Sequence, residues 1–599
     1  MKKISITSIY VFLLLAVCSK TYGQTYNLDK SLKGFDKYIE QVMKDWNSPG
    51  IVVGIVIKNE LVYSKGFGYR DLENKLPVSS KTLFPIASNT KLFTSVAMGM
   101  LVEEGKLAWD EPISKYVPQI TFYNQELYNT VTLRDMLAHR TGISRHDFIW
   151  YKSDFTREEL FERLKYLEPA QPIRQSSLYN NLMYAAAGYS LELITGKTWE
   201  DFVEENIFNP LNMNSTLFTI EDMERQDDFA FPYYEERETD KLVKRPFYRE
   251  QQGIGPAGAI ISNIEDMSKW VIALICQGNF KGNQVISSNI LRETLQPAIP
   301  VPNTALETKG YDEILNPIYG MGRGFAAYKG HYLTKHGGAI GGFYSQVSMM
   351  PYDSIGVVVF VNGAHNRPLI DIISYNIYDR LLGLEQTDFN GRSLKNRIES
   401  KKANQEARKA AGSDKIANTK PSHLLADYQG QYENPAYGIL NIILEGDQLK
   451  FDFHNIVLPL EHYHYDRFDT PNDQIYGQYS INFSSNPQGD IHKAVISLDE
   501  SEVTFIKKTD ASLSDPKTLS KYVGKYELAG DIIEIILKNE DVLISKMSGY
   551  PDYTLVPYKS HIFTFKEFSD YSIEFTLEGN KVITMKLVLP SGTYEYYKK

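Results

Sequence analysis

An internal repeat in the last third of the chain constrains how its 599 residues divide. The stretch Leu-Ala-Asp-Tyr-Gln-Gly-Gln-Tyr-Glu around Tyr428 recurs as Leu-Ser-Lys-Tyr-Val-Gly-Lys-Tyr-Glu around Tyr522. Each copy continues into alternating segments rich in Tyr, Phe and Ile, which are typical of β-strands. The repeat therefore predicts two small all-β, barrel-like modules, residues 421–510 and 515–599, and neither contains a motif that indicates chemistry.

The residues before the repeat predict one larger α+β domain, residues 30–385. Two apolar runs, Ile51–Ile57 and Leu61–Phe67, flank a polar turn and indicate an antiparallel hairpin. Two more strand-like runs lie near residues 344–350 and 355–361, and helical patterns fill most of the interval. Strands at both ends with helices between them predict one antiparallel sheet that both ends of the domain complete.

Two polar segments have compositions unlike their surroundings. Residues 386–420 are rich in Lys, Arg, Glu, Asn and Ala, and we interpret them as a linker that can be helical. The charged segment from about Glu221 to Gln252 is either an ordered lid or a solvated insertion, and the insertion is the preferred interpretation.

The first residues predict export. A lysine pair precedes the apolar run Ile9–Val17, and cleavage after Gly23 would remove residues 1–23 as a signal peptide. A lipid anchor at Cys18 is not favoured, because Val17 is larger than the residue normally found before such a cysteine. No later segment is apolar over enough length to cross a membrane, so we expect a periplasmic or secreted protein.

Composition narrows the classes of function. The formal net charge is −10 at pH 7 and no stretch concentrates basic residues, so nucleic acid is not expected as a partner. The only cysteines are Cys18 and Cys276, so a mature monomer cannot form a disulfide. His139 and His146 are interpreted as structural or exposed, and we expect no metal and no cofactor.

Ser88 is the candidate nucleophile. It stands in Phe-Pro-Ile-Ala-Ser-Asn-Thr-Lys, and apolar residues follow at helical spacing from Leu92 to Met100, before Gly105. Ser88 is therefore expected to open a helix, where unpaired backbone N–H groups and the helix dipole favour developing negative charge. Lys91 would lie on the same helical face, within reach of the Ser88 oxygen.

The pattern Ser-x-x-Lys is not specific by itself. It recurs at Ser514 and Lys517, in a polar, proline-containing stretch that predicts a turn. Ser88 could equally be only a helix N-cap, so residues elsewhere in the chain must decide between the two interpretations.

Two further motifs carry polar groups that suit a site. Tyr179-Asn-Asn181 stands just before a predicted helix, where a phenol can take or relay a proton and an amide can orient a carbonyl. The stretch Thr-Lys-His-Gly-Gly-Ala is expected to precede a strand. In this stretch His336 supplies a polar side chain, and the glycines allow a ligand or another segment to approach the backbone closely.

Taken in order, these motifs resemble the three-part signature of the penicillin-recognising serine hydrolases: Ser88-x-x-Lys91, Tyr179-x-Asn181 and His336-x-Gly338. Within that group the chain resembles most the class C β-lactamases, D-alanyl-D-alanine carboxypeptidases, D-aminopeptidases and related esterases. The resemblance covers about residues 30–385. It implies an antiparallel sheet with helices on its faces and an all-helical subdomain. The two β modules resemble those often appended to such hydrolases.

The resemblance implies acyl transfer through a covalent intermediate on Ser88. Lys91 or Tyr179 would remove the serine proton, and the sequence leaves both open, since a lysine ammonium beside the phenol would lower the pKa of the tyrosine. The backbone N–H groups of Ser88 and Ala339 would stabilise the oxyanion, and Asn181 would hold the substrate amide. A water activated by Tyr179 would then release the acyl group.

Two departures from the family pattern shape the expected substrate. His336 stands where β-lactamases have a lysine that helps to bind the β-lactam carboxylate, and histidine is mostly neutral near pH 7. Pro172-Ile173 replaces the usual Pro-Gly upstream of the tyrosine motif, so the loop that presents Tyr179 is expected to differ in shape.

We therefore expect an exported serine hydrolase that cleaves an ester or amide, in a D-amino-acid peptide or a related small acyl substrate. Cell-wall components are candidate partners. One alternative is a penicillin-binding protein that recognises cell-wall peptides with little turnover. Another is a true β-lactamase, which would act on β-lactam-like substrates.

Overall fold

The computed structural model describes residues 26–250, 252–301, 312–499, 501–539, 541–568 and 570–599. The chain forms two compact units, one ending at Ala411 and one beginning at Gly412. The predicted signal peptide, residues 1–23 with Cys18, lies outside the described residues. No helix in the described part of the chain combines the length and the apolar character needed to cross a membrane.

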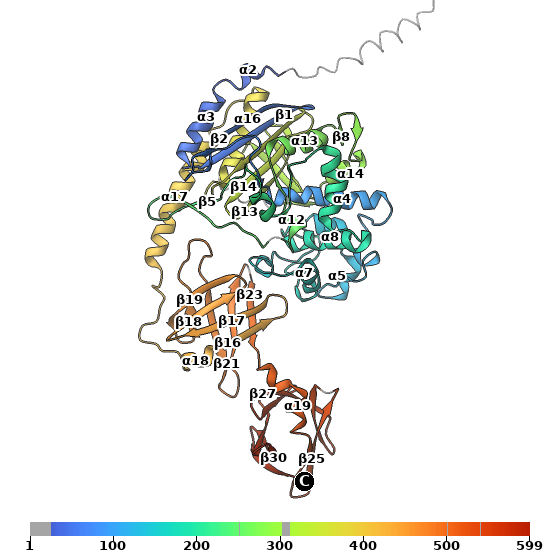
Figure 1. Cartoon of the computed structure of the whole chain (residues 1–599), viewed down its shortest axis with the longest axis vertical. Coiled ribbons are helices and arrows are strands. Elements are labelled where there is room, and N and C mark those ends of the chain that lie inside the picture. Colours follow the sequence, from blue (N-terminus) through green and yellow to red (C-terminus); the bar gives the residue numbers. More distant parts are fainter. Residues whose placement is uncertain (1–25, 251, 302–311, 500, 540, 569) are drawn as a thin grey trace, which may run out of the picture. The chain divides into compact units, whose positions relative to one another are not determined.

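A nine-stranded sheet, in the order β10-β11-β12-β13-β14-β15-β1-β2-β3, is the centre of the first unit (Figure 1). Its strands are β1 (Gly50–Ile57), β2 (Glu60–Asp71), β3 (Leu76–Pro77), β10 (Ile299–Pro300), β11 (Ile314–Tyr319), β12 (Gly324–Tyr328), β13 (His331–Ile340), β14 (Phe343–Met350) and β15 (Ile355–Val361). Strand β1 pairs antiparallel with both neighbours, so Ile51 lies opposite Phe67 on one side and Val361 on the other. Both ends of the domain complete one antiparallel sheet, which confirms the predicted α+β class.

Helices surround this sheet. They are α2 (Leu28–Ser31), α3 (Phe35–Asp45), α4 (Thr90–Glu103), α5 (Gln125–Thr130), α6 (Leu133–Leu137), α7 (Arg157–Arg163), α8 (Asn181–Thr195), α9 (Trp199–Val203), α10 (Asn209–Leu211), α11 (Ile220–Glu224), α12 (Gly255–Gly258), α13 (Ile264–Ile275), α14 (Ser288–Thr294), α16 (Arg367–Leu382) and α17 (Phe389–Ala410). Three short strand pairs accompany them: β4 (Phe84–Pro85) with β7 (Ile261–Ser262), β5 (Tyr233–Glu235) with β6 (Leu242–Lys244), and β8 (Asn279–Phe280) with β9 (Asn283–Gln284).

Every residue of β1 is buried, because helices cover both faces of the sheet. Its odd-numbered residues share one hydrophobic core with α3 and α16. On the other face Gly54 packs on α13 so closely that a Cβ would lie 2.5 Å from the side chain of Ile264. Helices α4, α7, α8 and α12 pack on one another and form the helical part of the unit (Figure 1).

The segment predicted as a linker, residues 386–420, is largely the helix α17. Its residue Asn390 accepts a hydrogen bond from Nε1 of Trp46 at 2.8 Å, and Arg397 forms an ion pair with Glu235 at 2.7 Å. These long-range contacts attach the helix to the first unit. Composition could not indicate them, since they depend on single residues far away in the sequence.

The charged segment is ordered rather than merely solvated in its described residues, 221–250 and 252. It contains α11 and the hairpin β5–β6, and Tyr233 within it is fully buried. The Tyr233 hydroxyl donates a hydrogen bond to Glu73 at 2.6 Å. Aromatic residues together with ion pairs, such as those of Lys244 with Asp71 and Glu73, therefore hold this segment on the domain.

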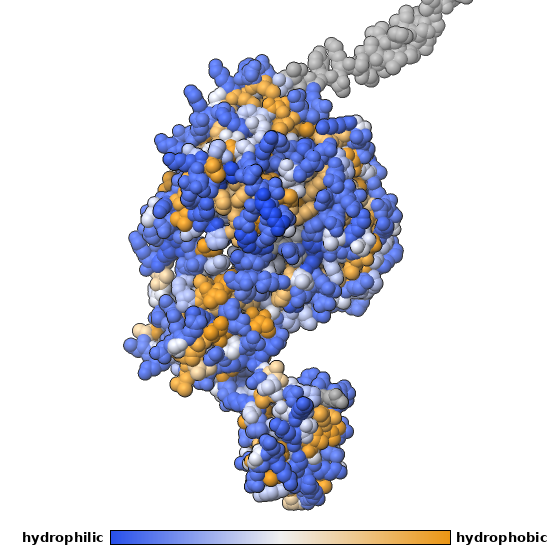
Figure 2. Space-filling model, in the orientation of Figure 1, coloured by the Kyte–Doolittle hydropathy of each residue, from blue (hydrophilic) through white to orange (hydrophobic). Residues whose placement is uncertain are grey.

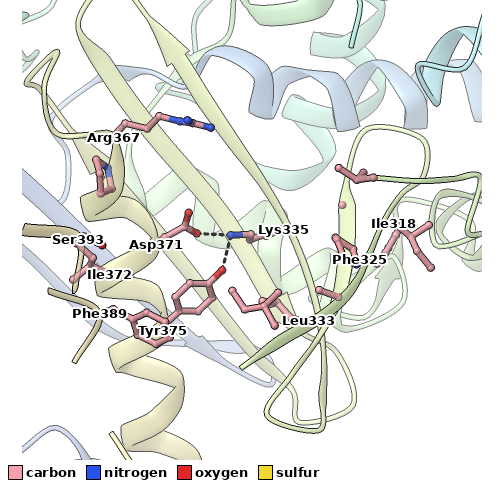
Figure 3. Close-up of a pocket in the computed structure, with 16 residues that line it drawn as sticks. Ile318, Phe325, Leu333, Lys335, Arg367, Asp371, Ile372, Tyr375, Phe389 and Ser393 are labelled. Carbon is pink, nitrogen blue, oxygen red and sulfur yellow. Dashed lines mark hydrogen bonds and ion pairs between the residues drawn. The ribbon is translucent and has the colours of Figure 1, made fainter. Parts of the chain in front are cut away.

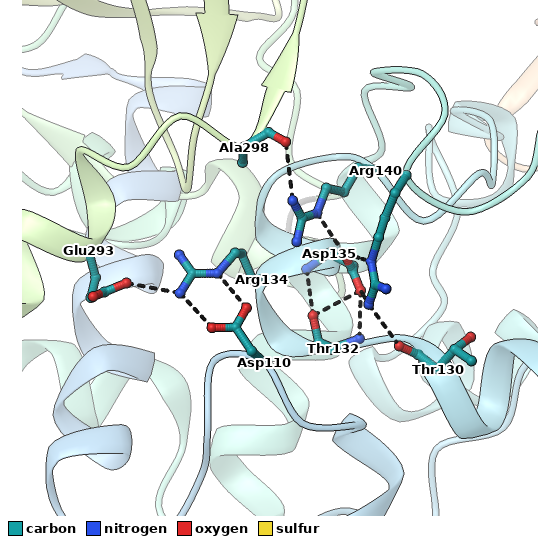
Figure 4. A network of polar contacts seen from close by, with 9 residues as sticks. Asp110, Thr130, Thr132, Arg134, Asp135, Arg140, Glu293 and Ala298 are labelled. Carbon is teal, nitrogen blue, oxygen red and sulfur yellow. Dashed lines mark hydrogen bonds and ion pairs between the residues drawn. The ribbon is translucent and has the colours of Figure 1, made fainter.

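A buried carboxylate connects α6 with the loop that leads to the tyrosine motif (Figure 4). Asp135 is fully buried and accepts hydrogen bonds from Arg140 at 2.6 Å and Arg174 at 2.7 Å. It also closes a capping box with Thr132. Burial would raise the pKa of Asp135, but Arg174, Thr132 and Arg140 outweigh it and hold this pKa below its usual value. Asp135 is therefore charged near neutral pH and fixes the loop through Arg174.

The second unit consists of two closed, eight-stranded, antiparallel barrels, which confirms the predicted barrel-like modules. The first contains β16 (Gly430–Asn434), β17 (Gly438–Glu445), β18 (Gln448–Phe453), β19 (Ile456–His464), β20 (Arg467–Asp469), β21 (Ser480–Ser485), β22 (Ile491–Leu498) and β23 (Ser501–Lys507). The second contains β24 (Gly524–Leu528), β25 (Asp531–Lys538), β26 (Val542–Met547), β27 (Tyr553–Lys559), β28 (Ile562–Phe565), β29 (Ser572–Glu578), β30 (Lys581–Leu589) and β31 (Gly592–Lys598). The short helices α18 (Leu425–Tyr428) and α19 (Pro516–Ser520) precede the two barrels.

The surface visible in Figure 2 is mostly hydrophilic, with hydrophobic residues in scattered groups. Scattered apolar groups are ordinary on a folded surface. The features that stand out in this molecule therefore lie in its cavities and its buried polar groups.

Candidate active site

Ser88 lies in a 3₁₀ turn, Ala87–Asn89, at the start of helix α4. Ala87 has a φ of 47°, a left-handed conformation that residues with a side chain rarely adopt. Backbone strain of this kind is concentrated at functional sites. The turn leaves Ser88 partly exposed between buried neighbours, and α4 ends before Gly105 as the sequence predicted.

The three residues predicted to be catalytic lie in mutual contact. Lys91 Nζ is 3.0 Å from Ser88 Oγ, and the Tyr179 hydroxyl donates a hydrogen bond to the same oxygen at 2.9 Å. Lys91 is fully buried and also donates to Asn181 Oδ1 and to the carbonyl oxygen of Ala257, both at 2.8 Å. The serine hydroxyl is thus placed between an amine and a phenol.

Burial sets the protonation of both groups around Ser88. It holds the pKa of Lys91 well below its usual value, and Arg145 acts in the same direction while Asp147 opposes it. Burial also raises the pKa of Tyr179 above its usual value. The sequence predicts a lowered tyrosine pKa if Lys91 is charged, but desolvation, which depends on the fold, outweighs the hydrogen bond to Ser88 and the charge of Arg145.

Asn181 connects the catalytic lysine to a carboxylate. Its Oδ1 accepts from Lys91, and its Nδ2 donates to Asp147 Oδ1 at 3.0 Å. Asp147 also accepts hydrogen bonds from Trp150 Nε1 at 2.8 Å and from Arg145 Nε at 2.7 Å. Both polar atoms of Asn181 are therefore engaged within the protein, which orients Lys91. No motif in the sequence marked Asp147.

His139 holds the tyrosine motif in place. Its Nδ1 accepts a hydrogen bond from the backbone N–H of Asn180 at 3.1 Å, and its ring centroid lies 4.1 Å from that of Tyr179. Burial lowers the pKa of His139 well below its usual value, and Lys91 acts in the same direction, so the imidazole is neutral. Among the residues that the structure describes, no cluster of His, Cys, Asp or Glu could hold a metal ion.

The third motif lies within strand β13 and does not precede a strand as expected. A Cβ on Gly338 would lie 2.2 Å from the carbonyl oxygen of Ile86 and 3.1 Å from the Cβ of Ala87. Only glycine permits this approach of the strand to the turn of Ser88. The next residue, Ala339, is exposed on the strand, beside the turn where a second oxyanion donor is required.

His336 is engaged by protein groups at both ring nitrogens. The hydroxyl of Tyr319 lies 2.8 Å from Nε2, and the carbonyl oxygen of Gly337 lies 2.7 Å from Nδ1. A carbonyl only accepts, so Nδ1 carries the proton and Nε2 accepts from Tyr319. Burial, together with the charges of Lys91 and Arg323, lowers the pKa of His336 to about 3. His336 therefore supplies no positive charge to a substrate at neutral pH.

The neighbouring Lys335 does not replace that charge. Successive strand residues point to opposite faces of a sheet, and Lys335 points to the face covered by α16 (Figure 3). It forms an ion pair with Asp371 and donates to the Tyr375 hydroxyl at 2.7 Å, at the edge of a cavity of about 390 Å³. The lysine is held away from Ser88.

A second cavity, of about 270 Å³, adjoins Ala339. Its walls include the aromatic residues Trp150, Tyr151, Tyr248 and Phe343. The rings of Tyr151 and Tyr248 stack with centroids 5.5 Å apart. The polar segment 221–252 thus contributes Tyr248 to the wall beside the oxyanion position, a role that its charged composition did not indicate.

A β-lactamase-like domain with Ser88, Lys91 and Tyr179 in contact defines the class of the β-lactamase-fold serine hydrolases. The chain belongs to the Beta-lactamase family, whose profile matches residues 35–378. A domain of unknown function, DUF3471, matches residues 414–510, which include the first barrel.

Individual proteins agree with this assignment. The chain is 27% identical over 441 residues to unguisins hydrolase ungD of Aspergillus violaceofuscus, which covers 69% of this chain and 76% of that protein. It is 25% identical over 340 residues to protein flp of Staphylococcus aureus (strain MW2), which covers 55% of this chain and 63% of that protein. The octameric penicillin-binding protein homologue from Pyrococcus abyssi shares the fold, with a TM-score of 0.54 and 22% identity over 79% of this chain and 99% of that chain. The chain is thus a serine hydrolase-type enzyme.

Proposed function

We propose that this protein is an exported serine hydrolase that forms an acyl-enzyme on Ser88 and cleaves an ester or amide, in a D-amino-acid peptide or a related small acyl substrate. One observation carries the proposal: Ser88 Oγ contacts both Lys91 Nζ at 3.0 Å and the Tyr179 hydroxyl at 2.9 Å. Acyl transfer needs a base for the serine and an acid for the leaving group, and these two contacts supply both. The proposal of export depends on the signal peptide that the sequence predicts for residues 1–23.

The hydrogen bonds around Lys91 favour this residue as the base. Carbonyl oxygens only accept, so Asn181 and Ala257 hold two N–H bonds of the amine. In the neutral amine, which burial favours, the lone pair then faces Ser88 Oγ and takes its proton as Ser88 attacks the carbonyl. Tyr179 stays protonated and gives its proton to the leaving group, and Lys91 replaces that proton. Water then takes the place of the leaving group and attacks the acyl carbon, losing a proton through Tyr179 to Lys91. Lys91 returns that proton to Ser88 Oγ as the acid is released.

Replacing Lys91 with arginine tests whether Lys91 acts as a base or only supplies a positive charge. We expect Lys91→Arg to lower kcat/KM for p-nitrophenyl butyrate at least about 100-fold, because a guanidinium is not deprotonated in proteins. In the wild type, kcat/KM should rise with pH through the pKa of Lys91, which burial places well below its usual value. Retained activity in Lys91→Arg, measured by steady-state hydrolysis, would show that only the charge matters and that Tyr179 is the base.

The role of Tyr179 as acid predicts a dependence on the leaving group. Tyr179→Phe should lower kcat/KM, which reports acylation, about 100-fold for an alkyl ester, whose leaving alkoxide needs a proton. The loss should be much smaller for a p-nitrophenyl ester, which leaves as a stable anion. Equal losses for the two esters, measured side by side, would contradict the acid role.

The surroundings of the site support a small acyl or peptide substrate. His336 is neutral and is engaged by Tyr319, so a β-lactam carboxylate lacks the cation that the family's lysine provides. The aromatic cavity beside Ala339 offers space for an apolar substituent of the acyl group. The name of one relative, unguisins hydrolase, agrees with hydrolysis as the type of reaction.

Arg323 favours a second candidate, a penicillin-binding protein with little turnover. It is 3% exposed, and its Nε and Nη2 have no hydrogen-bond partner among the described residues. Burial lowers its pKa to about 10, so it is charged at neutral pH, and it lines a small cavity with His336. This cavity, of about 20 Å³, holds about one water, through which the Arg323 cation would attract a substrate carboxylate. A benzylpenicillin adduct on Ser88 that persists for hours, seen by intact mass without ester turnover, would favour this candidate.

A further inference from the structure

We propose that the second barrel, β24–β31, binds a short neutral glycan. A closed barrel of eight strands is either just filled by its side chains or holds one small ligand. This barrel contains a cavity of about 640 Å³, which lies in the usual range for small-molecule sites. Nearly half of the residues that line the cavity are aromatic.

The first barrel shows why the second is hollow. In the first, Phe453 lies opposite Leu440 and Phe451 opposite Ile442. Phe451 is fully buried and stacks on Tyr479, with centroids 4.8 Å apart. Phe453 is also fully buried, so these rings occupy the interior of the first barrel.

The same positions carry smaller side chains in the second barrel. There Met547 lies opposite Ile533, and Ser545 lies opposite Ile535. Ser545 therefore occupies the position of Phe451, and Met547 that of Phe453. Tyr571, which precedes β29 as Tyr479 precedes β21, has no ring at the position of Phe451 to stack on. It stacks instead on Phe568, with centroids 5.0 Å apart, and both rings line the cavity. At these two positions the second barrel therefore has smaller side chains than the first, and both side chains line its cavity.

The cavity wall combines aromatic faces with unpaired polar groups. The hydroxyls of five tyrosines have no hydrogen-bond partner among the described residues: Tyr550, Tyr553, Tyr571, Tyr594 and Tyr596. The carboxylate of Asp531 lies on the same wall and has no ion-pair partner within the described ranges. Water can reach these groups while the cavity is empty, since Tyr550 and Tyr594 are exposed. A ligand that covers them displaces this water, so it must bring hydroxyl groups as well as apolar surface.

A glycan meets both requirements. The C–H face of a sugar ring packs on aromatic rings, and its hydroxyls donate to a carboxylate and bond with tyrosine hydroxyls. A fatty acyl chain would leave those hydroxyls unpaired, and an anionic ligand would be repelled by Asp531. The rim is accessible, since Tyr550 is 62% exposed and Tyr594 is 42% exposed. A glycan chain can therefore enter at one end of the barrel.

Calorimetric titration of the full mature chain with three trisaccharides tests this proposal. The trisaccharides are triacetylchitotriose, cellotriose and maltotriose. We expect at least one of them to bind the wild type. Ser545→Phe restores the ring found in the first barrel and should weaken binding at least about tenfold, because it fills the cavity. Tyr550→Ala removes an exposed rim residue, leaves the fold intact and should weaken binding at least about threefold.

Tyr597→Ala is the matched control, because this tyrosine lies on β31 but is 61% exposed and does not line the cavity. We expect this control to bind like the wild type. Binding by none of the three trisaccharides would overturn the proposal. So would equal binding by the wild type, Ser545→Phe and Tyr550→Ala, or binding of dodecanoate in place of the sugars.

Discussion

Replacing Ser88 with alanine is expected to abolish ester hydrolysis, with a loss of kcat on the order of 10⁴-fold or more. The alanine cannot form the acyl-enzyme, and Lys91 and Tyr179 are left without the oxygen that both contact. The measurement is steady-state hydrolysis of p-nitrophenyl butyrate together with intact mass after exposure to a fluorophosphonate. The wild type should gain one adduct, and Ser88→Ala should gain none.

The chain provides a control with the same local sequence pattern. Ser514 and Lys517 also match Ser-x-x-Lys, but Ser514 ends a 3₁₀ turn in the second unit and Lys517 lies in α19. Ser514→Ala should leave both the adduct and the rate unchanged. Full activity in Ser88→Ala would show that the nucleophile lies elsewhere, whatever the geometry around Ser88.

Replacing Asp135 with asparagine is expected to lower the free energy of unfolding of the first unit by about 3 kcal/mol, because it leaves buried arginine charge without its partner. Asp135 is fully buried and binds both Arg140 and Arg174. Urea unfolding followed by tryptophan fluorescence measures this unit alone. All five tryptophans lie in it: Trp46, Trp109, Trp150, Trp199 and Trp270.

The control for this change is Asp110→Asn in the neighbouring ion pair (Figure 4). Asp110 pairs with Arg134, but its side chain is 65% exposed, so the expected cost is below about 1 kcal/mol. The pKa of Asp135 is lowered in the folded state, so its contribution is present above the unfolded pKa of about 3.9. The stability difference between wild type and Asp135→Asn should shrink as pH falls through the folded pKa. Equal costs for the two variants would contradict the special role of Asp135.

Local patterns in the sequence were sufficient to predict the architecture. The run Ile51–Ile57 predicted a strand, and its lack of polar residues agrees with burial on both faces. The repeat around Tyr428 and Tyr522 predicted two β modules, because each copy carries the full strand pattern. The contacting group of Ser88, Lys91 and Tyr179 was also predicted, although its members are far apart, because the family signature marks each of them.

What the sequence did not indicate depends on contacts between distant residues. Asp147 became part of the site through Asn181, and Tyr248 through stacking on Tyr151. The raised pKa of Tyr179 depends on desolvation, which no motif encodes. The cavity of the second barrel depends on Ser545 lying at the position that Phe451 has in the first barrel. This equivalence follows from the strand pairing, which the sequence alone does not show.

The pairing of β1 with β15 sets the order in which the enzyme can mature. During synthesis the first hairpin emerges early, but the edge of β1 stays unpaired until residues 355–361 have been made. Long-range strand pairing of this kind is slow, and until it forms the unpaired edge of β1 can pair with other strands or other chains. A nascent chain halted after residue 340 would already contain all three signature motifs and still lack the strand that closes its sheet. Catalytic competence therefore begins with a strand that carries no catalytic residue.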